Sequence, residues 1–306
     1  MAGARREFEF GLQVANAGSR AEWQETARRA EGAGFDSILI GDHVVDGILS
    51  PMVALDAMAE VTTTLRVGTC MLNNDFRHPA LLAREAATLD LLSDGRLELG
   101  IGAGHAAPEY AEIGLPFDPA ARRVDRLEES VVILRRLFDG ETVSCAGEHY
   151  QLREHRLFPL RRPLLTVGGN GDRVLRIAAR HADAVGITGL GRTRADGQFH
   201  DLEWRHDEID AKVDVIRAGA GERADTLRIQ ALVQHVQLTD DRAGVVEAMA
   251  RRLGNDPAVM LDAPYLWVGG VTEIVERARA ARDRWGFDYF VTRSLDASTP
   301  IIAALR

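Results

Sequence analysis

The fold of this chain is decided by residues 65–105, which read LRVGTCMLNNDFRHPALLAREAATLDLLSDGRLELGIGAGH. An apolar, β-rich run over 65–72 predicts a strand, and a helical pattern with Pro79 near its start follows over 79–93. A second apolar run over 96–102 predicts another strand. Strand, helix and strand in this order indicate a βαβ unit, in which the two strands are parallel.

The same alternation extends along the whole chain. Strands are predicted over 8–14, 36–41, 65–72, 96–102, 164–169, 183–187, 227–238 and 288–293. Helices are predicted after Ser19 and over 52–62, 79–93, 119–138, 172–182, 204–218, 241–253 and 271–285. Residues 142–152 resemble an inserted hairpin, and 189–203 a polar loop. Eight strands with helices between them favour a closed (β/α)8 TIM barrel with inserted segments, and the alternative is an open, doubly wound sheet.

The composition limits the possible partners and compartments. A length of 306 residues fits one α/β barrel, so we expect a single domain over 1–306. The apolar runs are shorter than the ~20 residues of a membrane span, and no signal peptide is recognisable. A net charge of −9 disfavours nucleic acid as a partner. Cys70 and Cys145 form no CxxC motif, so a cytoplasmic location is expected.

The chain contains a single lysine, Lys212, within DEIDAKVDVI. Its surroundings predict the polar face of a surface helix. Schiff-base catalysis requires a desolvated lysine, so the lysine-dependent barrel aldolases are excluded as a class.

Polar residues and glycines follow the ends of several predicted strands. In a closed barrel these positions gather at one mouth, where the active sites of this fold lie. They are Asp42 and His43; Cys70, Met71, Asn73, Asn74 and Asp75; Gly104, His105, Glu109 and Tyr110; Gly168, Gly169, Asn170 and Gly171; and Arg293. This gathering predicts a functional site at the mouth.

Two glycine-rich turns lie among these positions. VGGNGDRVLRI, residues 167–177, can present backbone N–H groups and a helix N-terminus to an anion, although an ordinary tight turn is the alternative. GIGAGH, residues 100–105, fails the dinucleotide-binding pattern because His105 replaces the third glycine and no helical pattern follows directly. Its glycines allow close approach of a flat ligand, or form a plain turn.

Other chemistries at the mouth are weaker hypotheses. His43 could transfer a proton, ligate a metal or make a structural hydrogen bond, and Asp42 could pair with an arginine. His200, Glu203 and His206 do not have the HExxH spacing, and the two histidines would lie on different helix faces, so no metal site is predicted. Cys70 has no recognisable base to activate it as a nucleophile.

Five segments together resemble the bacterial luciferase-like superfamily: 34–44 (GFDSILIGDHV), 65–105, 108–138, 163–187 and 268–291. Residues 189–226 are the least similar. Members of this superfamily are (β/α)8 barrels that use either reduced FMN or coenzyme F420, a deazaflavin, and this sequence is more similar to the F420-dependent branch.

The resemblance implies roles for particular residues. His43 would lie near the ring and take part in proton transfer, and Asp42 would line the ring pocket with Asn73, Gly104 and His105. A bulge at Cys70–Met71, often a non-prolyl cis peptide in that branch, would support one face of the ring. The phosphate-bearing tail of the cofactor would bind at Gly168, Gly169, Asn170 and Gly171.

One position departs from the family pattern. Sugar-phosphate dehydrogenases of this branch have a glutamate where this chain has His105, and the nearest carboxylate is Glu109. The lysines that such enzymes use for substrate phosphate are also absent, so glucose 6-phosphate is a doubtful substrate. The candidate catalytic residues are therefore His43, His105 and Glu109.

These observations favour an F420-dependent oxidoreductase that transfers a hydride between the ring and a small organic substrate. An FMN-dependent monooxygenase using reduced FMN and O2 is the alternative, and a cofactor-binding protein without turnover is a third possibility. The resemblance also implies a homodimer, formed through the second and third predicted helices and the 96–102 region. We expect residues 189–226 to cover the mouth and set specificity.

Overall fold

The computed structural model describes residues 6–45, 47–193 and 200–306. Parallel strands close into a barrel because β3 pairs with both β2 and β5. The barrel strands are β1 (Glu9–Val14), β2 (Ser37–Ile40), β3 (Arg66–Thr69), β5 (Leu97–Gly102), β8 (Leu164–Gly168), β9 (Ala184–Ile187), β12 (Arg228–Leu232) and β15 (Phe287–Thr292). A two-residue strand, β4 (Leu72–Asn73), continues β3 after a bulge and pairs with β5. The predicted TIM barrel is confirmed.

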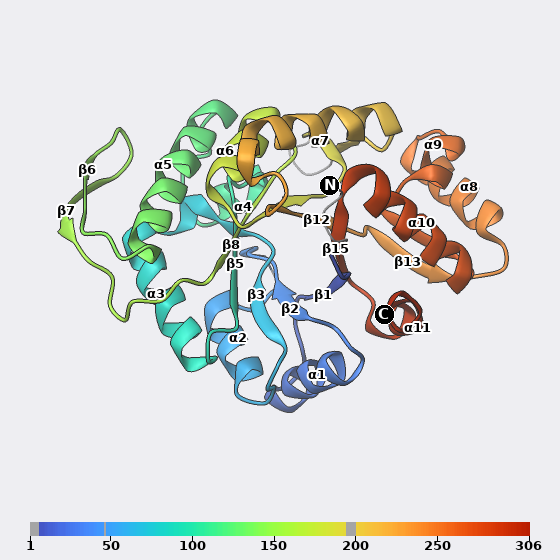
Figure 1. Cartoon of the computed structure of the whole chain (residues 1–306), viewed down its shortest axis with the longest axis horizontal. Helices are drawn as coiled ribbons and strands as arrows, with labels where there is room; N and C mark the ends of the chain where they lie inside the picture. Colours follow the sequence, from blue (N-terminus) through green and yellow to red (C-terminus); the bar gives the residue numbers. More distant parts are fainter. Residues whose placement is uncertain (1–5, 46, 194–199) are drawn as a thin grey trace.

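Helices surround the barrel, as Figure 1 shows. They are α1 (Arg20–Gly32), α2 (Pro51–Ala59), α3 (Pro79–Leu92), α5 (Ala120–Phe138), α6 (Asp172–His181), α7 (His206–Ala220), α10 (Val271–Trp285) and α11 (Leu295–Leu305). The shorter or outlying ones are α4 (Ala107–Glu112), α8 (Arg242–Leu253) and α9 (Pro257–Asp262). In the described part of the chain, no helix has the length and apolar character needed to cross a membrane.

The predicted strand over 227–238 is wrong in its extent. It is divided into β12, in the barrel, and β13 (His235–Leu238), which pairs in parallel with an unpredicted strand, β14 (Leu266–Gly269). The break lies at Gln234, whose backbone N–H donates to the carbonyl oxygen of Tyr265 at 2.8 Å. Apolar periodicity continues across this point, so the sequence pattern does not reveal the change of partner.

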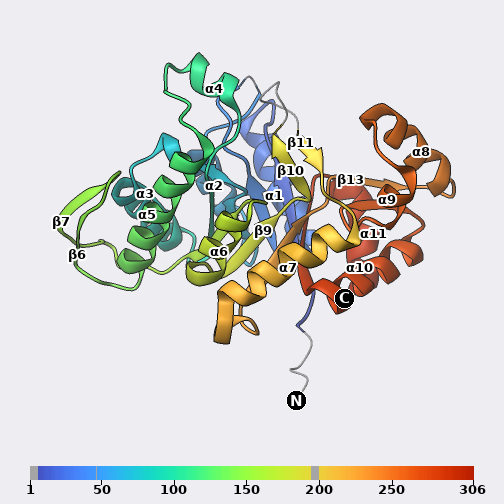
Figure 2. The same cartoon turned by 90° about the horizontal axis from the view of Figure 1, so that it is seen from above.

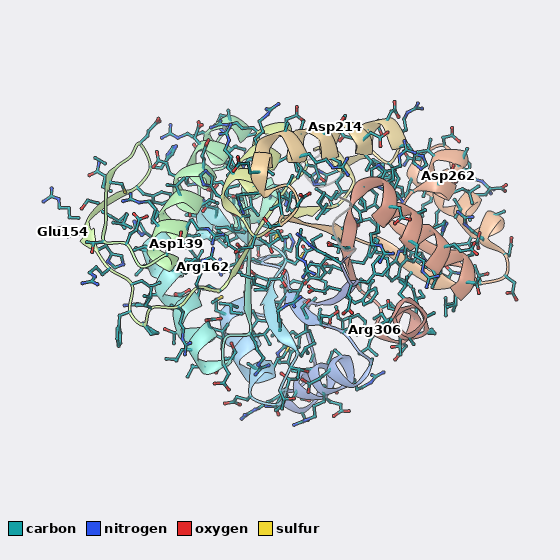
Figure 3. The ribbon with its side chains drawn as sticks, viewed as in Figure 1. Asp139, Glu154, Arg162, Asp214, Asp262 and Arg306 are labelled. Carbon is teal, nitrogen blue, oxygen red and sulfur yellow. The ribbon has the colours of Figure 1, made fainter. Side chains whose placement is uncertain are left out.

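Two hairpins are inserted between barrel elements. The predicted one comprises β6 (Val143–Ala146) and β7 (Gln151–His155) and extends away from the barrel beside α5 (Figure 1). In the segment that follows this hairpin, Nε of Arg162 donates a hydrogen bond at 3.0 Å to the Asp139 carboxylate, which lies at the C-terminal end of α5 (Figure 3). The second insertion corrects the loop prediction for 189–203 where the structure describes it, because β10 (Leu190–Thr193) and β11 (His200–Leu202) pair antiparallel. Residues 194–199 of that prediction lie outside the described residues.

A polar network fills the barrel near the N-terminal ends of the strands. The Glu98 carboxylate accepts hydrogen bonds from the Tyr289 hydroxyl at 2.8 Å and the Gln230 amide at 3.1 Å. We call this the Glu98 network, and its members are Glu98, Tyr289, Gln230, Ser37, Thr166 and Arg66. Glu98 is only 2% exposed, and burial raises its pKa although Arg66 opposes that change. This end of the barrel is therefore closed to solvent.

Candidate active site

The opposite end of the barrel is the mouth, formed by the C-terminal ends of the strands. Figure 2 shows α4 and the β10–β11 hairpin together at the end away from the N-terminus. The side chains predicted from the strand ends meet here, and contacts join residues that are far apart in sequence, such as His43 and Glu109.

The centre of the site is a histidine–carboxylate pair. The Nδ1 atom of His43 lies 2.7 Å from Oε1 of Glu109, which is on α4. A carboxylate only accepts hydrogen bonds, so Nδ1 carries the hydrogen. The second oxygen of Glu109 accepts the backbone N–H of Val44 at 3.3 Å. Glu109 is 8% exposed and so is a fixed partner, whereas the His43 side chain is 39% exposed at the mouth.

Two further histidine rings lie beside this pair. The His105 ring is 5.7 Å from that of His43, edge to face, and 5.2 Å from that of His200. Desolvation, together with the positive charge that His200 and His43 would carry, lowers the pKa of His105 to about 4. His105 is therefore neutral at neutral pH. His200, which the sequence pattern presented only as a rejected metal ligand, belongs to the site instead.

Asp42 forms an ion pair with an arginine. This is one of the two roles considered for it, and the other is lining the ring pocket. Its carboxylate binds both terminal nitrogens of Arg77 and also accepts the backbone N–H of Asn73 at 3.0 Å. Asp42 is 7% exposed, so this ion pair holds the segment after β3 against the segment after β2. Arg77 was missed from the sequence because it lies 35 residues away.

The bulge after β3 has the predicted geometry, since the peptide bond between Cys70 and Met71 is cis. The carbonyl oxygen of Cys70 accepts the side-chain amide of Gln13 at 2.6 Å. Burial and the nearby Glu98 carboxylate raise the pKa of the Cys70 thiol to about 12, which keeps it protonated. A nucleophilic thiolate at this position is thereby disfavoured.

The Met71 side chain occupies space left by glycines on two later strands. A Cβ atom on Gly168 would lie 2.7 Å from Cγ of Met71, and one on Gly186 would lie 2.5 Å from its Cε. Gly168 was predicted to bind the cofactor's tail, but the contact with Met71 gives a packing reason for glycine here. Met71 thus lies directly beneath the mouth.

The segment after β5 is tightly packed at Gly104, which has a φ of +75°. A Cβ atom there would lie 2.2 Å from the Tyr110 hydroxyl and 2.5 Å from Oδ1 of Asn73. The Tyr110 hydroxyl in turn donates to that Asn73 oxygen at 3.0 Å. Asn73 and Gly104 therefore shape the wall of the mouth. The Tyr110 bond and a second one, from the backbone N–H of Asp75 at 3.1 Å, hold the Asn73 amide in place.

The turn after β8 is partly used for internal contacts. The Asn170 side chain exchanges two hydrogen bonds with Thr188, at 2.8 and 3.1 Å. Gly169 packs against Val174, where a Cβ atom would be 2.7 Å from Cγ1. Gly171 caps α6 with no side-chain hydrogen bond to the first turn and has open space around it. The first-turn N–H groups of α6 are thus free of a side-chain cap, as an anion site requires.

Lys212 corrects the prediction of an exposed lysine. Its ammonium group is 2.5 Å from Oε2 of Glu203 and donates to the carbonyl oxygen of Asn170 at 2.6 Å. The residue is 9% exposed, on the inner side of α7. It connects α7 to the turn after β8, and the contacts of its ammonium group with Glu203 and Asn170 leave the Schiff-base exclusion in place.

The family model for luciferase-like monooxygenase matches residues 8–289. The chain belongs to this family. That match includes the first half of β15, the other barrel strands in whole, and each of the candidate catalytic residues.

Members of the F420-dependent glucose-6-phosphate dehydrogenases are among the similar proteins. The enzyme of Amycolatopsis mediterranei is 33% identical over 168 residues, which are 52% of this chain and 50% of that protein. The one from Kineococcus radiotolerans is 36% identical over 166 residues, 51% and 49% of the two chains. This chain thus matches about half the length of these curated relatives.

Solved structures of the luciferase-like family share the fold. An F420-dependent secondary alcohol dehydrogenase in complex with an F420–acetone adduct superposes with a TM-score of 0.77 at 19% identity. The superposition covers 98% of this chain and all of that one. The F420-dependent tetrahydromethanopterin reductase of Methanopyrus kandleri has a TM-score of 0.74 at 18% identity, over 97% of both chains. A long-chain alkane monooxygenase also matches, with a TM-score of 0.71 at 15% identity.

Besides Arg77 and His200, two more residues of the site were not predicted. Gln13, at the end of β1, binds Cys70, and Gln234, after β12, binds Thr188 through its side chain at 3.0 Å. Both follow the strand-end rule used for the other residues. A polar amide next to the end of each apolar strand was the signal that could have identified them.

Proposed function

We propose that this protein is a coenzyme F420-dependent oxidoreductase that transfers a hydride between the deazaflavin ring and a small organic substrate. The observation that carries the proposal is the His43–Glu109 pair beside the Cys70–Met71 bulge at the mouth. The curated relatives named for F420 support the choice of cofactor.

The residues at the mouth fit a flat ring with an anionic tail. Gly41 leaves an open position between His43 and the bulge, because a Cβ atom there would have only ordinary contacts, 3.5 Å or longer. β5 separates the bulge after β3 from β8, and after β8 the uncapped first turn of α6 offers backbone N–H groups to a phosphate. His43, the Cys70–Met71 peptide and Asn73 would hold the ring, and Gly169–Gly171 the tail.

When bound, F420 supplies a ring carbon that accepts or gives a hydride. The role of the chain is to move the accompanying proton. Because Glu109 accepts the Nδ1–H of His43, the Nε2 atom presents its lone pair to the mouth and can take the proton of a substrate hydroxyl. The buried carboxylate then stabilises the imidazolium that forms, and the reverse reaction returns that proton to a carbonyl oxygen.

His105 has a different role in this proposal. Because the pKa of His105 is about 4, almost no His105 imidazole is protonated at neutral pH. His105 is therefore poorly suited to act as a general acid. We assign His105 and His200 to the wall of the substrate pocket, where the neutral His105 ring can donate and accept hydrogen bonds. His43 is then the proton-transferring residue, with Glu109 as its positioning partner.

The cofactor assignment is tested by titrating the purified protein separately with oxidised F420 and with FMN. Tight F420 binding and weak FMN binding are expected. Tight FMN binding without F420 binding would instead favour the flavin monooxygenase, which consumes O2 when given reduced FMN. F420 binding with no turnover across a broad panel of alcohols, ketones and enones would favour a non-catalytic binding protein.

Glucose 6-phosphate is not our proposed substrate. The relatives carry that name, but this chain has His105 at the position of the expected glutamate, and its one lysine is paired with Glu203. A turnover assay with glucose 6-phosphate and F420 is expected to show no activity above background. Activity comparable to that with alcohols would contradict this expectation.

We also propose a cytoplasmic, single-domain protein that forms a homodimer. Apolar side chains are exposed on the two helices implied in dimer formation, with Val53 on α2 76% exposed and Leu81 on α3 52% exposed. Both cysteines are free thiols, as a reducing compartment would keep them. Light scattering after gel filtration tests the dimer, and substituting Val53→Asp should shift the mass to that of a monomer.

A further inference from the structure

Arg293 follows β15 and lies exposed at the mouth. Its Nε atom donates to Oε1 of Gln13 at 2.7 Å, and its Nη1 atom donates to Oε1 of Gln234 at 3.3 Å. A guanidinium group has five N–H donors. Most of the donors of Arg293, including both on Nη2, therefore remain available for a ligand.

The two glutamines hold the guanidinium in a fixed orientation. The amide nitrogen of Gln13 donates to the carbonyl oxygen of Cys70 at 2.6 Å, and that of Gln234 donates to the carbonyl oxygen of Thr188 at 3.0 Å. With each amide nitrogen used in this way, each amide oxygen must face Arg293. An arginine fixed before binding loses little side-chain entropy when it takes a ligand.

The positive charge of Arg293 is not neutralised by a neighbour. Other arginines near the site bind carboxylates, as Arg77 does with Asp42 and Arg126 with Asp75 at 2.7 Å. Over residues 6–45, 47–193 and 200–306, no carboxylate forms an ion pair with Arg293, and both of its acceptors are neutral amides. A fixed, unpaired guanidinium of this kind suits planar or tetrahedral oxyanions.

Arg293 lies close to the proton-transferring histidine. The strand order places β1 between β15 and β2, so the ends of β15 and β2 are about 10 Å apart. The position of a Cβ atom on Gly41 would be 3.5 Å from Cδ2 of His43 and 3.8 Å from Nε2 of Gln13, the residue that holds Arg293. One small molecule can therefore reach both groups across the Cys70–Met71 bulge.

From this arrangement we infer that Arg293 binds an anionic group, a carboxylate or a phosphate, of the small-molecule substrate. The inference rests on the proposed function, because it places the carbon that exchanges the hydride near His43 and the anion near Arg293. The substrate class is thus a small hydroxy or oxo compound that carries an oxyanion a few bonds from the reacting carbon.

The test uses the full-length protein, with and without F420, and matched probes that differ in charge. Lactate with lactamide, and glycerol 3-phosphate with glycerol, are titrated while binding is followed by saturation-transfer NMR. The wild-type protein should prefer the anionic member of at least one pair by ~10-fold or more. Arg293→Gln should abolish this preference, and Arg293→Lys should retain part of it, since lysine keeps the charge but not the planar fork.

The control is Arg20→Gln, an exposed arginine on α1 paired with Glu60, and it should leave the preference unchanged. Absence of a charge preference in the wild type, or its survival in Arg293→Gln, would overturn the inference. Loss of F420 affinity in Arg293→Gln with an unchanged probe preference would assign Arg293 to the cofactor and overturn it too. Failure of the wild type to bind F420, with an Arg293-dependent preference intact, would instead remove the proposed function and leave the anion site.

Discussion

The two ends of the barrel use similar residue types in opposite ways. In the Glu98 network, the carboxylate is surrounded by donors from several strands and has almost no contact with solvent. At the mouth, within the described part of the chain, His43 has one fixed partner and a free nitrogen, and Arg293 has neutral partners and free donors. The comparison teaches that satisfied polar groups hold the barrel together, whereas partly satisfied ones are available for chemistry.

The largest expected effect is a loss of activity, with little loss of stability, when His43 at the mouth is replaced. Changing His43→Asn removes the proton-transferring nitrogen, and we expect the rate of hydride transfer to fall by about 10²–10⁴-fold. The free energy of unfolding should change by less than ~1 kcal/mol, because the residue is partly exposed. Single-turnover reduction of F420 with the identified substrate, alongside urea unfolding, measures both. A variant that retained more than a tenth of the wild-type rate would contradict the role of His43.

The second prediction concerns the Glu98 network, where we expect a large loss of stability. Changing Glu98→Leu leaves the Arg66 guanidinium, the Tyr289 hydroxyl and the Gln230 amide without their shared acceptor. We expect a loss of about 3–5 kcal/mol in the free energy of unfolding, measured by urea denaturation. The control is Glu98→Gln, which keeps an acceptor oxygen and should lose less. Equal losses for the two variants would show that packing, not hydrogen bonding, sets the contribution of this side chain.

A smaller effect is expected for the neighbouring hydroxyl group. Changing Tyr289→Phe removes the bonds to Glu98 at 2.8 Å and to Ser37 at 2.5 Å and leaves the ring in place. We expect a loss of about 1–2 kcal/mol in the free energy of unfolding, because two buried polar groups each lose one partner. The change in F420 affinity should be small, because phenylalanine keeps the ring that lies in one buried cluster with Cys70, and the lost hydrogen bonds are those to Glu98 and Ser37. A large change in F420 affinity would show that the two ends are coupled.

The smallest effect concerns pH. The folded pKa of His105, about 4, is below its ordinary value of 6.5, so the unfolded chain binds more protons between these values. Stability from this residue is therefore present above about pH 6.5 and is lost as the pH falls towards 4. Neighbouring groups desolvate the His105 ring, but part of the side chain stays in contact with solvent at the mouth, so the effect is modest. Urea midpoints at pH 7.5 and 5 should differ less for His105→Asn than for the wild type, and an equal difference would contradict the assignment.

The barrel strands were predictable because each one is a short apolar run bounded by polar residues or glycines. The residues at their ends were predictable for the same reason, since a barrel brings strand ends together wherever they lie in sequence. Side-chain contacts and strand pairings that depend on three-dimensional packing were not predictable from the sequence. Nothing local to His43 indicates Glu109 as its partner, and nothing local to β13 indicates that it pairs with β14 instead of continuing the barrel.

The side chain of Met71 links three strands in a way that affects how this barrel can evolve or be redesigned. Alanine at position 186 collides with Cε of Met71, and alanine at position 168 collides with its Cγ. The Met71 side chain must shift to admit either methyl group, so the effects of substitutions at 71, 168 and 186 on stability are coupled and non-additive. At position 100 no such compensation exists, because a Cβ atom there would meet the backbone oxygen of Thr69 at 2.0 Å. The region beneath the mouth therefore accepts change at 71, 168 and 186 as a set, while 100 stays glycine.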